Sequence, residues 1–232
     1  MALTNTGGIM LKETKEFIET FEPKLPSKAT RNFSLLISFI FHPVFMPTIL
    51  TYGMYYFVRA QFAGIDSRMF NMHLIMIFMS TAFFPILSVL LMKALGFVDS
   101  IHLYKPRDRF IPLVACMLCY FGTYWFFKEN NAPFLLRLLL LGSYLNIVAL
   151  FLVNIFFKVS MHTTGAGGML GMLIVLMILS PVSLALPLFL GLLIAGMVGT
   201  ARMLLRAHHA SEIWFGYLLG IAVQLAAYWY LS

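Results

Sequence analysis

Five side chains near the ends of apolar segments have types and spacings that suit chemistry. His162 follows Ser160 in the sequence Ser-Met-His, and a second cluster reads Arg202-x5-His208-x3-Glu212. An imidazole serves as a nucleophile or a proton donor near neutral pH, and a guanidinium binds phosphate oxygens through paired hydrogen bonds. A charged group at bilayer depth costs about 2.5–3.5 kcal/mol. Polar groups gathered beside apolar segments therefore either lie in headgroup water or form a site.

The composition indicates an integral membrane protein. Of the 232 residues, 61% are hydrophobic and 11% are charged, and the mean hydropathy is +0.89. Soluble domains carry about 25% charged residues. A net charge of +7 would suggest a nucleic-acid partner in a soluble protein. In a membrane protein, basic loops and phosphate-bearing lipids explain that charge, so we expect no nucleic acid as partner.

The apolar runs predict an all-α, polytopic bundle of six to seven transmembrane helices. Each run is judged against the roughly 20 residues that a helix needs to cross a bilayer. We count seven of them, at 33–58, 70–97, 110–128, 133–157, 164–180, 182–200 and 210–231. Only Ser180-Pro181 separates the fifth from the sixth, which predicts a tight helical hairpin. Prolines inside the runs predict kinks, at Pro43, Pro47, Pro85 and Pro187.

The polar amino-terminal part differs from the rest of the chain. Residues 1–32 form a separate segment, and residues 33–232 form one membrane domain. Within the segment, residues 10–22 place apolar side chains among Lys and Glu, which favours a short amphipathic helix on the membrane surface. Pro23 and Pro26 end that helix.

The connections after the second, fourth and sixth spans carry the polar clusters. Lys105, Arg107 and Arg109 follow the second span, residues 158–162 follow the fourth, and residues 202–212 follow the sixth. Two crossings separate each cluster from the next, so all three lie on one membrane face. Their surplus of cations matches a phosphate group. The sequence therefore predicts one phosphate site at that face.

Local spacing also suggests how the site works. Glu212 lies one helical turn after His208, where its carboxylate can hold the imidazole in the tautomer that leaves the other nitrogen free to attack. His209 is the rival nucleophile. Gly165 and Gly167 begin the fifth span, where backbone amides at a helix amino terminus can approach an anion closely.

At these residues the chain resembles the type 2 phosphatidic acid phosphatase superfamily of membrane lipid phosphatases, as a divergent member. The family's third motif, Ser-Arg-x5-His-x3-Asp, aligns without gaps at Arg202, His208 and Glu212, with Ala in place of Ser and Glu in place of Asp. The second motif, Pro-Ser-Gly-His, aligns at Ser160 and His162 and lacks the Pro and the Gly. The longer acidic side chain lengthens the orienting arm by one methylene.

The family's first motif, Lys-x6-Arg-Pro, is degenerate in this chain. Lys105 and Arg109 are closer together than the motif requires, and Arg107 is the alternative arginine. The resemblance implies that His208 attacks phosphorus to form a phosphohistidine and that His162 protonates the leaving group, without a metal or other cofactor. It implies that the phosphoryl oxygens are bound by Arg202, Lys105 and Arg109, with Arg107 as the alternative arginine. We expect Ser160 and Gly165 to bind the phosphate as well, Gly165 through its place at the helix amino terminus.

Other polar residues receive plainer interpretations. We expect three histidines to be interfacial polar groups: His42, His73 and His102. Lys158 and Arg206 are expected to be interfacial cations. Cys116 and Cys119 have the C-x-x-C spacing of a redox or metal site, but without a second pair they are expected to be small apolar residues on a membrane helix.

Three classes of function remain open. The resemblance implies a phosphatase for a lipid phosphate or pyrophosphate, such as undecaprenyl pyrophosphate, phosphatidylglycerophosphate or phosphatidate, in the bacterial inner (cytoplasmic) membrane. A lipid phosphotransferase on the same fold is the alternative. A transporter or scaffold ranks last, because the spans carry neither ionisable groups near their middle nor a repeated half. The partner is then a phosphorylated lipid within the bilayer. The lipid, the membrane face and the oligomeric state are left open.

Overall fold

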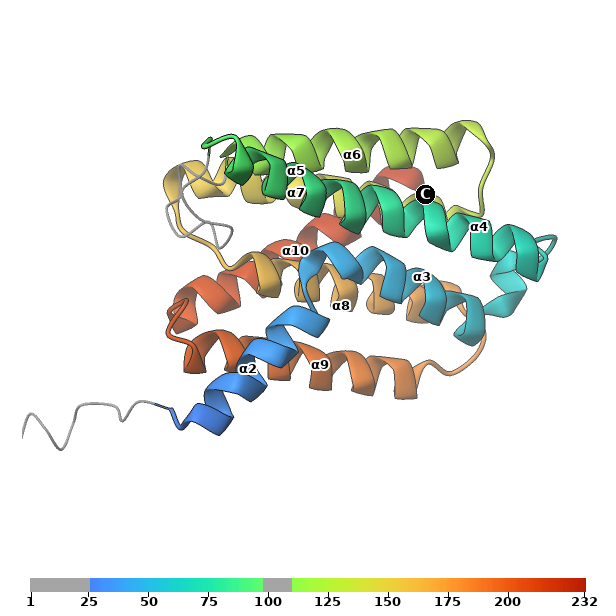
Figure 1. Ribbon diagram of the computed structural model, residues 1–232. Coiled ribbons are helices and arrows are strands. Elements are labelled where there is room, and N and C mark those ends of the chain that lie inside the picture. Colours follow the sequence, from blue (N-terminus) through green and yellow to red (C-terminus); the bar gives the residue numbers. More distant parts are fainter. Residues whose placement is uncertain (1–25, 98–109) are drawn as a thin grey trace, which may run out of the picture.

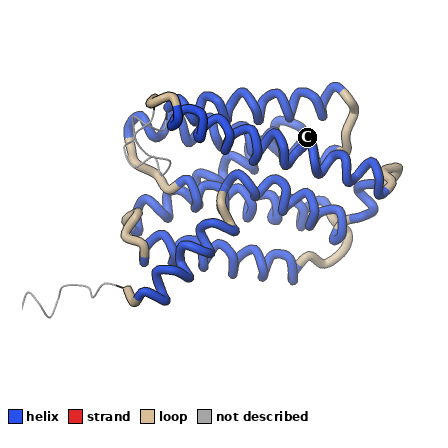
Figure 2. Tube along the Cα trace, in the orientation of Figure 1, coloured by secondary structure: helices blue, strands red, loops and turns tan. Residues whose placement is uncertain are grey.

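The computed structural model describes residues 26–97 and 110–232, which are helical and contain no strand (Figure 2). Among these residues seven segments are long and apolar enough to cross a membrane: Lys28–Phe57, Ser67–Ala94, Phe110–Glu129, Phe134–Phe156, Met161–Leu179, Ala185–Leu204 and Ala210–Leu231. The predicted all-α polytopic bundle is confirmed, and the chain is an integral membrane protein. The amphipathic helix predicted at 10–22 lies outside the described residues.

The first span is broken into two helices. Helix α2 (Lys28–Ile40) and helix α3 (Met46–Phe57) are joined by a short 3-10 turn, η1 (Pro43–Phe45). Pro43 begins η1 and Pro47 lies in the first turn of α3, positions at which the missing N–H removes no helical hydrogen bond. The interruption predicted at these prolines is confirmed. The span begins at Lys28, five residues before the predicted boundary at residue 33.

The second span is interrupted in a milder way. Helices α4 (Ser67–Phe78) and α5 (Phe84–Ala94) are connected by a π-helical turn, η3 (Met79–Phe83), and Pro85 lies in the first turn of α5. Such a π turn accommodates a residue that cannot donate to the preceding helix. The second span is therefore interrupted next to Pro85, where a kink is predicted.

The remaining spans are continuous helices: α6 (Phe110–Glu129), α7 (Phe134–Phe156), α8 (Met161–Leu179), α9 (Ala185–Leu204) and α10 (Ala210–Leu231). The kink predicted at Pro187 is not needed, because α9 begins at Ala185 and the proline lies in its first turn. Helices α8 and α9 form the predicted hairpin. Cys116 and Cys119 lie on α6, both partly buried with free thiols.

Helix α8 is the most buried of the seven spans, and it packs closely against α10. Glycines make this contact possible: a Cβ added at Gly216 would overlap the Thr163 side chain, and one at Gly220 would overlap the backbone at Thr164 and Gly168. Small residues let helix backbones approach closely in a membrane, where packing drives association. The core lies around α7 and α8, with fully buried Leu136, Leu138, Met172 and Val175.

The helices run roughly side by side, and α2 crosses beside α9 (Figure 1). The connections from α7 to α8 and from α9 to α10 lie at the same end of the bundle, at the left in Figure 1. The end of α5 and the start of α6 lie there too, and Phe110 packs against Phe151 near the end of α7, with ring centroids 5.5 Å apart. The same-face arrangement predicted from the number of crossings is confirmed for the described connections.

Candidate functional site

His208 and Glu212 are in direct contact at the start of α10. His208 lies in the connection between α9 and α10, and its Nδ1 is 2.6 Å from Oε2 of Glu212 in the first turn of α10. An ionised carboxylate only accepts hydrogen bonds, so the imidazole donates from Nδ1 and keeps its lone pair on Nε2. The side chains of His208 and Glu212 are 6% and 17% exposed. The contact predicted from the four-residue spacing is confirmed, and its role in catalysis stays a prediction.

Glu212 also ties two connections together. Lys158, between α7 and α8, has its Nζ 3.7 Å from Oε2 of Glu212 and donates to the carbonyl oxygen of Ala207 at 3.1 Å. The backbone N–H of Ser160 donates to the carbonyl oxygen of Glu212 at 3.4 Å. Lys158 is therefore more than the interfacial cation that the sequence predicts. These bonds bring the second and third motifs side by side.

The surroundings of His208 favour its neutral form. Burial lowers the pKa of His208 from 6.5 to about 4. The hydrogen bond that His208 donates to Glu212 opposes this lowering, while the positive charges of Arg202 and Lys158 add to it. At neutral pH the imidazole is therefore uncharged, with an available lone pair on Nε2, which is the form that a nucleophile needs.

Ser160 and His162 are positioned by the first turn of α8. Ser160 is fully buried, and its Oγ accepts from the backbone N–H of Thr163 at 3.4 Å as the helix cap. The predicted start at residue 164 is three residues late, so His162 lies inside the helix. Its Nε2 is 3.2 Å from the carbonyl oxygen of Ser38 on α2. A carbonyl only accepts, so Nε2–H donates and Nδ1 is left for other partners.

His42 is a residue of this site that the sequence analysis does not include. It lies at the break between α2 and α3, and its ring centroid is 4.9 Å from that of His162, with the ring planes at 84°. Its Nδ1 accepts from the backbone N–H of Val44 at 3.5 Å. The available signal is Pro43, which predicts a break of the span next to this histidine. The expectation that His42 is only an interfacial polar group does not account for this contact.

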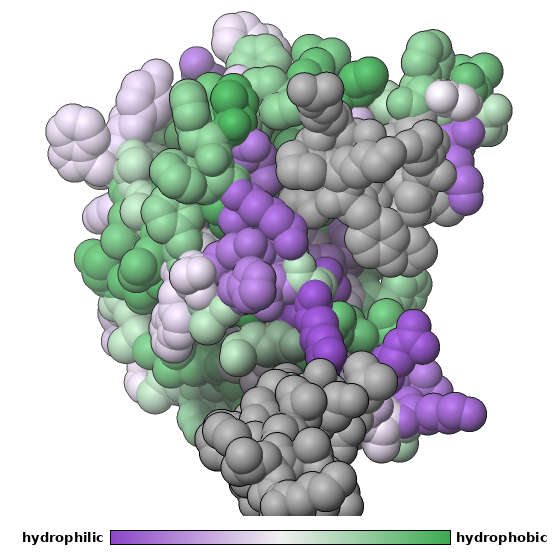
Figure 3. Space-filling model, turned by 90° about the vertical axis from the view of Figure 1, so that its left-hand side faces the viewer, coloured by the Kyte–Doolittle hydropathy of each residue, from purple (hydrophilic) through white to green (hydrophobic). Residues whose placement is uncertain are grey.

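Arg202 completes the group. It lies in the last turn of α9, is partly buried, and is close enough to interact electrostatically with His42, His162 and His208. We call His42, His162, Arg202, His208 and Glu212 the polar cluster. Figure 3 looks onto this end of the molecule, where hydrophilic side chains gather in the middle of a largely apolar surface.

The described structure does not bring the other predicted phosphate-binding residues into the polar cluster. Gly165 is the fifth residue of α8, so its N–H is not among the free groups at the helix start on which the prediction depends. Its small size lets Pro43 approach, since an added Cβ would lie 3.1 Å from Pro43 Cβ. Gly167 is packed against α10 in the same way. Three predicted phosphate-binding residues, Lys105, Arg107 and Arg109, lie outside the described part of the chain, as does His102, which is predicted to be an interfacial polar group.

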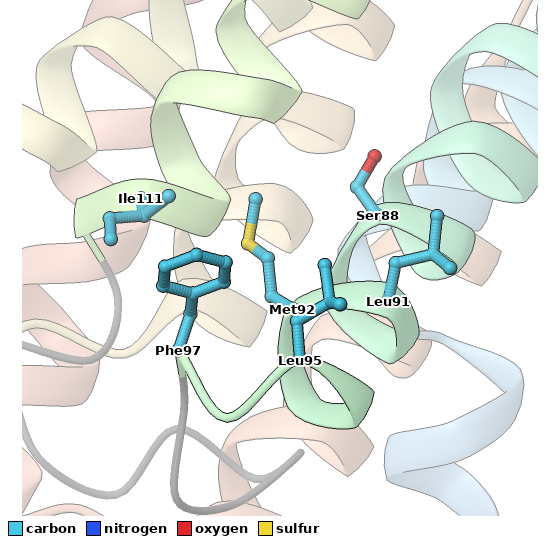
Figure 4. Close-up of a pocket in the computed structure, with 6 residues that line it drawn as sticks. All are labelled: Ser88, Leu91, Met92, Leu95, Phe97 and Ile111. Carbon is cyan, nitrogen blue, oxygen red and sulfur yellow. The ribbon is translucent and has the colours of Figure 1, made fainter.

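A hollow of about 360 Å³ lies elsewhere, between the end of α5 and the start of α6 (Figure 4). It is lined by Ser88, Leu91, Met92, Leu95, Phe97 and Ile111. Ser88 supplies the only hydroxyl among these lining residues, and none of them carries a charge. This lining offers no group for phosphate chemistry, so the polar cluster is the better candidate site.

The chain matches no family model, no curated protein and no solved structure.

Proposed function

We propose that the protein is a membrane lipid phosphate or pyrophosphate phosphatase that works through a phosphohistidine on His208. The observation that carries this proposal is the 2.6 Å contact between His208 Nδ1 and Glu212 Oε2. It holds a buried, neutral imidazole with its lone pair on Nε2, beside the guanidinium of Arg202. A nucleophile oriented by a carboxylate next to an anion-binding cation is the arrangement that phosphoryl transfer through a covalent intermediate requires.

The reaction proceeds in two displacements. Arg202 binds the phosphoryl oxygens, and His208 Nε2 attacks phosphorus while the bond to the leaving oxygen breaks. The electron pair of that bond goes to the leaving oxygen, which takes a proton from the imidazolium of His162 at Nδ1. Water then attacks phosphorus while the bond from phosphorus to His208 Nε2 breaks, and the electron pair of that bond returns to Nε2. His162 Nδ1 accepts the proton of that water, and inorganic phosphate leaves. Lys105, Arg107 and Arg109 are proposed as further cations for the phosphate, from the sequence alone.

A lipid substrate is supported by an apolar groove of about 390 Å³ between α2 and α9. Phe33 and Ile37 line it on one side, and Leu193 and Gly196 on the other, up to Ala201 beside Arg202. A hydrocarbon chain in this groove would leave its phosphate at the polar cluster. The candidate lipids are undecaprenyl pyrophosphate, phosphatidylglycerophosphate and phosphatidate, in the bacterial inner membrane.

A substitution at Gly196 tests the role of this groove. Gly196 has open space around it, so Gly196→Leu narrows the groove. We expect this variant to lose more activity, relative to the wild type, on long-chain substrates than on short-chain substrates.

The test is phosphate release by the detergent-purified protein from a panel of lipid phosphates and pyrophosphates, in the presence of EDTA. We expect release from the wild type, its loss in His208→Ala and in His162→Ala, and its retention in His209→Ala, which removes the rival imidazole. Release that depends on His209 and not on His208 would contradict the assignment. A lipid alcohol added as acceptor distinguishes hydrolysis from phosphotransfer, because the transferase forms a new phosphorylated lipid.

A further inference from the structure

His42 reaches the polar cluster because the first span breaks where it does. Helix α2 ends at Ile40, and Pro43 starts the short turn that packs against the first turns of α8. The closest approach is at Gly165, where an added Cβ would lie 3.1 Å from Pro43 Cβ and 3.3 Å from its Cα. A larger residue at 165 would push the turn away. The break and the glycine together place His42 against His162.

The hydrogen bonds of the two rings define their tautomers. The backbone N–H of Val44 donates to Nδ1 of His42, so Nδ1 carries the lone pair and the neutral ring holds its only proton on Nε2. His162 donates from Nε2 to the carbonyl oxygen of Ser38, which leaves its Nδ1 unoccupied by that bond. The rings stand nearly perpendicular, at 84°. His42 therefore brings one N–H donor to the cluster in addition to Arg202.

We propose that His42 binds the phosphoryl group of the substrate as a neutral hydrogen-bond donor through Nε2–H. This inference rests on the proposed phosphatase function and adds a residue to it. His42 has no second proton while Val44 occupies Nδ1, so complete transfer of its Nε2 proton would leave an imidazolate. It therefore stabilises negative charge on a phosphoryl oxygen. Protonation of the leaving oxygen stays with His162, whose Nδ1 is not used by the bond to Ser38.

Capping alone does not require a histidine at this position. The bond from Val44 needs only an acceptor near Nδ1, and asparagine, aspartate and serine are the usual residues for that task. Histidine adds a donor at Nε2, two bonds further along the ring. The two roles can therefore be separated by substitution.

The matched variants are His42→Asn and His42→Gln. Asparagine places its Oδ1 near the position of Nδ1 and keeps the cap, but it has no group near Nε2. Glutamine places an amide N–H close to the position of Nε2. We expect the kcat for dioctanoyl phosphatidate, measured with EDTA, to fall on the order of 100-fold in His42→Asn and less than tenfold in His42→Gln. Thermal melting in detergent checks that both variants fold.

Inhibition by orthovanadate provides a second readout. We expect weaker inhibition of His42→Asn than of the wild type, and an unchanged pH profile in His42→Gln. Wild-type kcat and orthovanadate affinity in His42→Asn would show that His42 only caps the turn, and would overturn the proposal. The proposal would also be overturned if both variants lost activity equally and one limb of their pH profile moved relative to the wild type. That result would mean that His42 titrates during turnover.

Failure of the proposed phosphatase function can be distinguished from failure of the proposed role of His42. If the wild type releases no phosphate from any lipid, the phosphatase proposal fails, and binding of inorganic phosphate is then measured by calorimetry. Binding by the wild type that weakens at least tenfold in His42→Asn would support His42 as a phosphate ligand without catalysis. Absence of phosphate binding by the folded wild type would overturn both proposals.

Discussion

At the scale of single residues, the carboxylate of Glu212 connects two functions of the site. It accepts from His208 Nδ1 at 2.6 Å, and it pairs with Lys158 Nζ at 3.7 Å. The first contact sets the tautomer of the proposed nucleophile, and the second ties the connection before α8 to the connection before α10. One oxygen, Oε2, takes part in both. The proposed orientation of His208 therefore depends on the charge of this side chain as well as on its shape.

Replacing Glu212 with glutamine tests the orienting role. The amide keeps the size of the side chain but removes its charge and allows the wrong imidazole tautomer, so we expect kcat to fall on the order of 10²–10⁴-fold with little change in KM. Glu212→Asp keeps the charge on a shorter arm and should retain more activity than Glu212→Gln. Steady-state kinetics with a short-chain lipid phosphate measures both. An unchanged kcat in Glu212→Gln would contradict the proposed orientation of His208.

The pH dependence of catalysis should report the lowered pKa of His208. Because this pKa is about 4, the nucleophile stays neutral above it and becomes a cation as the pH falls through it, so the acid limb of kcat/KM should lie near pH 4. Removing a nearby positive charge makes protonation easier and raises the pKa. We therefore expect Lys158→Met to move the acid limb toward 6.5, while Lys158→Arg leaves it in place. An acid limb that does not differ between these two variants would exclude Lys158 as a cause of the lowering.

At the scale of elements, the contact between α8 and α10 positions both histidine motifs. Ser160 and His162 lie at the start of α8, and Glu212 lies in the first turn of α10. The two helices approach closely because glycines line their contact, above all Gly216 and Gly220 on α10. At Gly220 backbone faces backbone, so no side-chain rearrangement can relieve added volume. The distance between the two motifs therefore depends on these small residues.

A methyl group at Gly220 tests this contact. The new Cβ would overlap the carbonyl oxygen of Thr164 and the amide of Gly168, so we expect Gly220→Ala to destabilise the protein by about 1–3 kcal/mol and to reduce activity. Gly122→Ala on α6 is the matched control, because open space surrounds that position. Its stability should be unchanged or higher, since alanine favours a helix over glycine. The melting temperature in detergent compares them, and equal values would contradict the close contact.

At the scale of the whole molecule, the number of crossings between two described segments decides whether they lie at the same end of the bundle. Six of the described spans separate the start of α2 from the connection before α10, and both lie at one end with the connection before α8, while the connection between α3 and α4 lies at the other (Figure 1). Among the described residues, Lys158, Arg202 and His208 lie at the first of these ends. Under the proposed function, a lipid phosphate would reach them from the leaflet on that side.

Labelling of single cysteines tests this polarity. In a background with Cys116→Ala and Cys119→Ala, we expect Lys28→Cys and His209→Cys to react with an impermeant maleimide from the same side of the membrane. Ala63→Cys, between α3 and α4, should react only from the opposite side. All three positions are exposed. Labelling of positions 28 and 209 from opposite sides would refute the count of six crossings between them, and the result also identifies the compartment of the site.

The sequence alone determined the features that depend on local pattern. Hydropathy over about 20 residues predicted the seven spans, counting crossings placed the polar connections on one face, and the four-residue spacing predicted the contact of His208 with Glu212. These predictions succeed because a helix imposes its period and its length on neighbouring residues. Helix boundaries were predicted less accurately than the spans themselves. Because the predicted start of α8 was three residues late, Gly165 was wrongly placed at the start of the helix.

Only the tertiary structure decided which side chains from distant spans meet. His42 lies against His162, 120 positions later in the numbering, and the carbonyl oxygen of Ser38 accepts from the same imidazole. Lys158 reaches Glu212 across another connection. Such contacts depend on where a proline-broken span bends and how closely glycine-lined helices approach. Those distances arise from the fit of side chains between helices, and neither hydropathy nor spacing along one helix encodes that fit in a readable form.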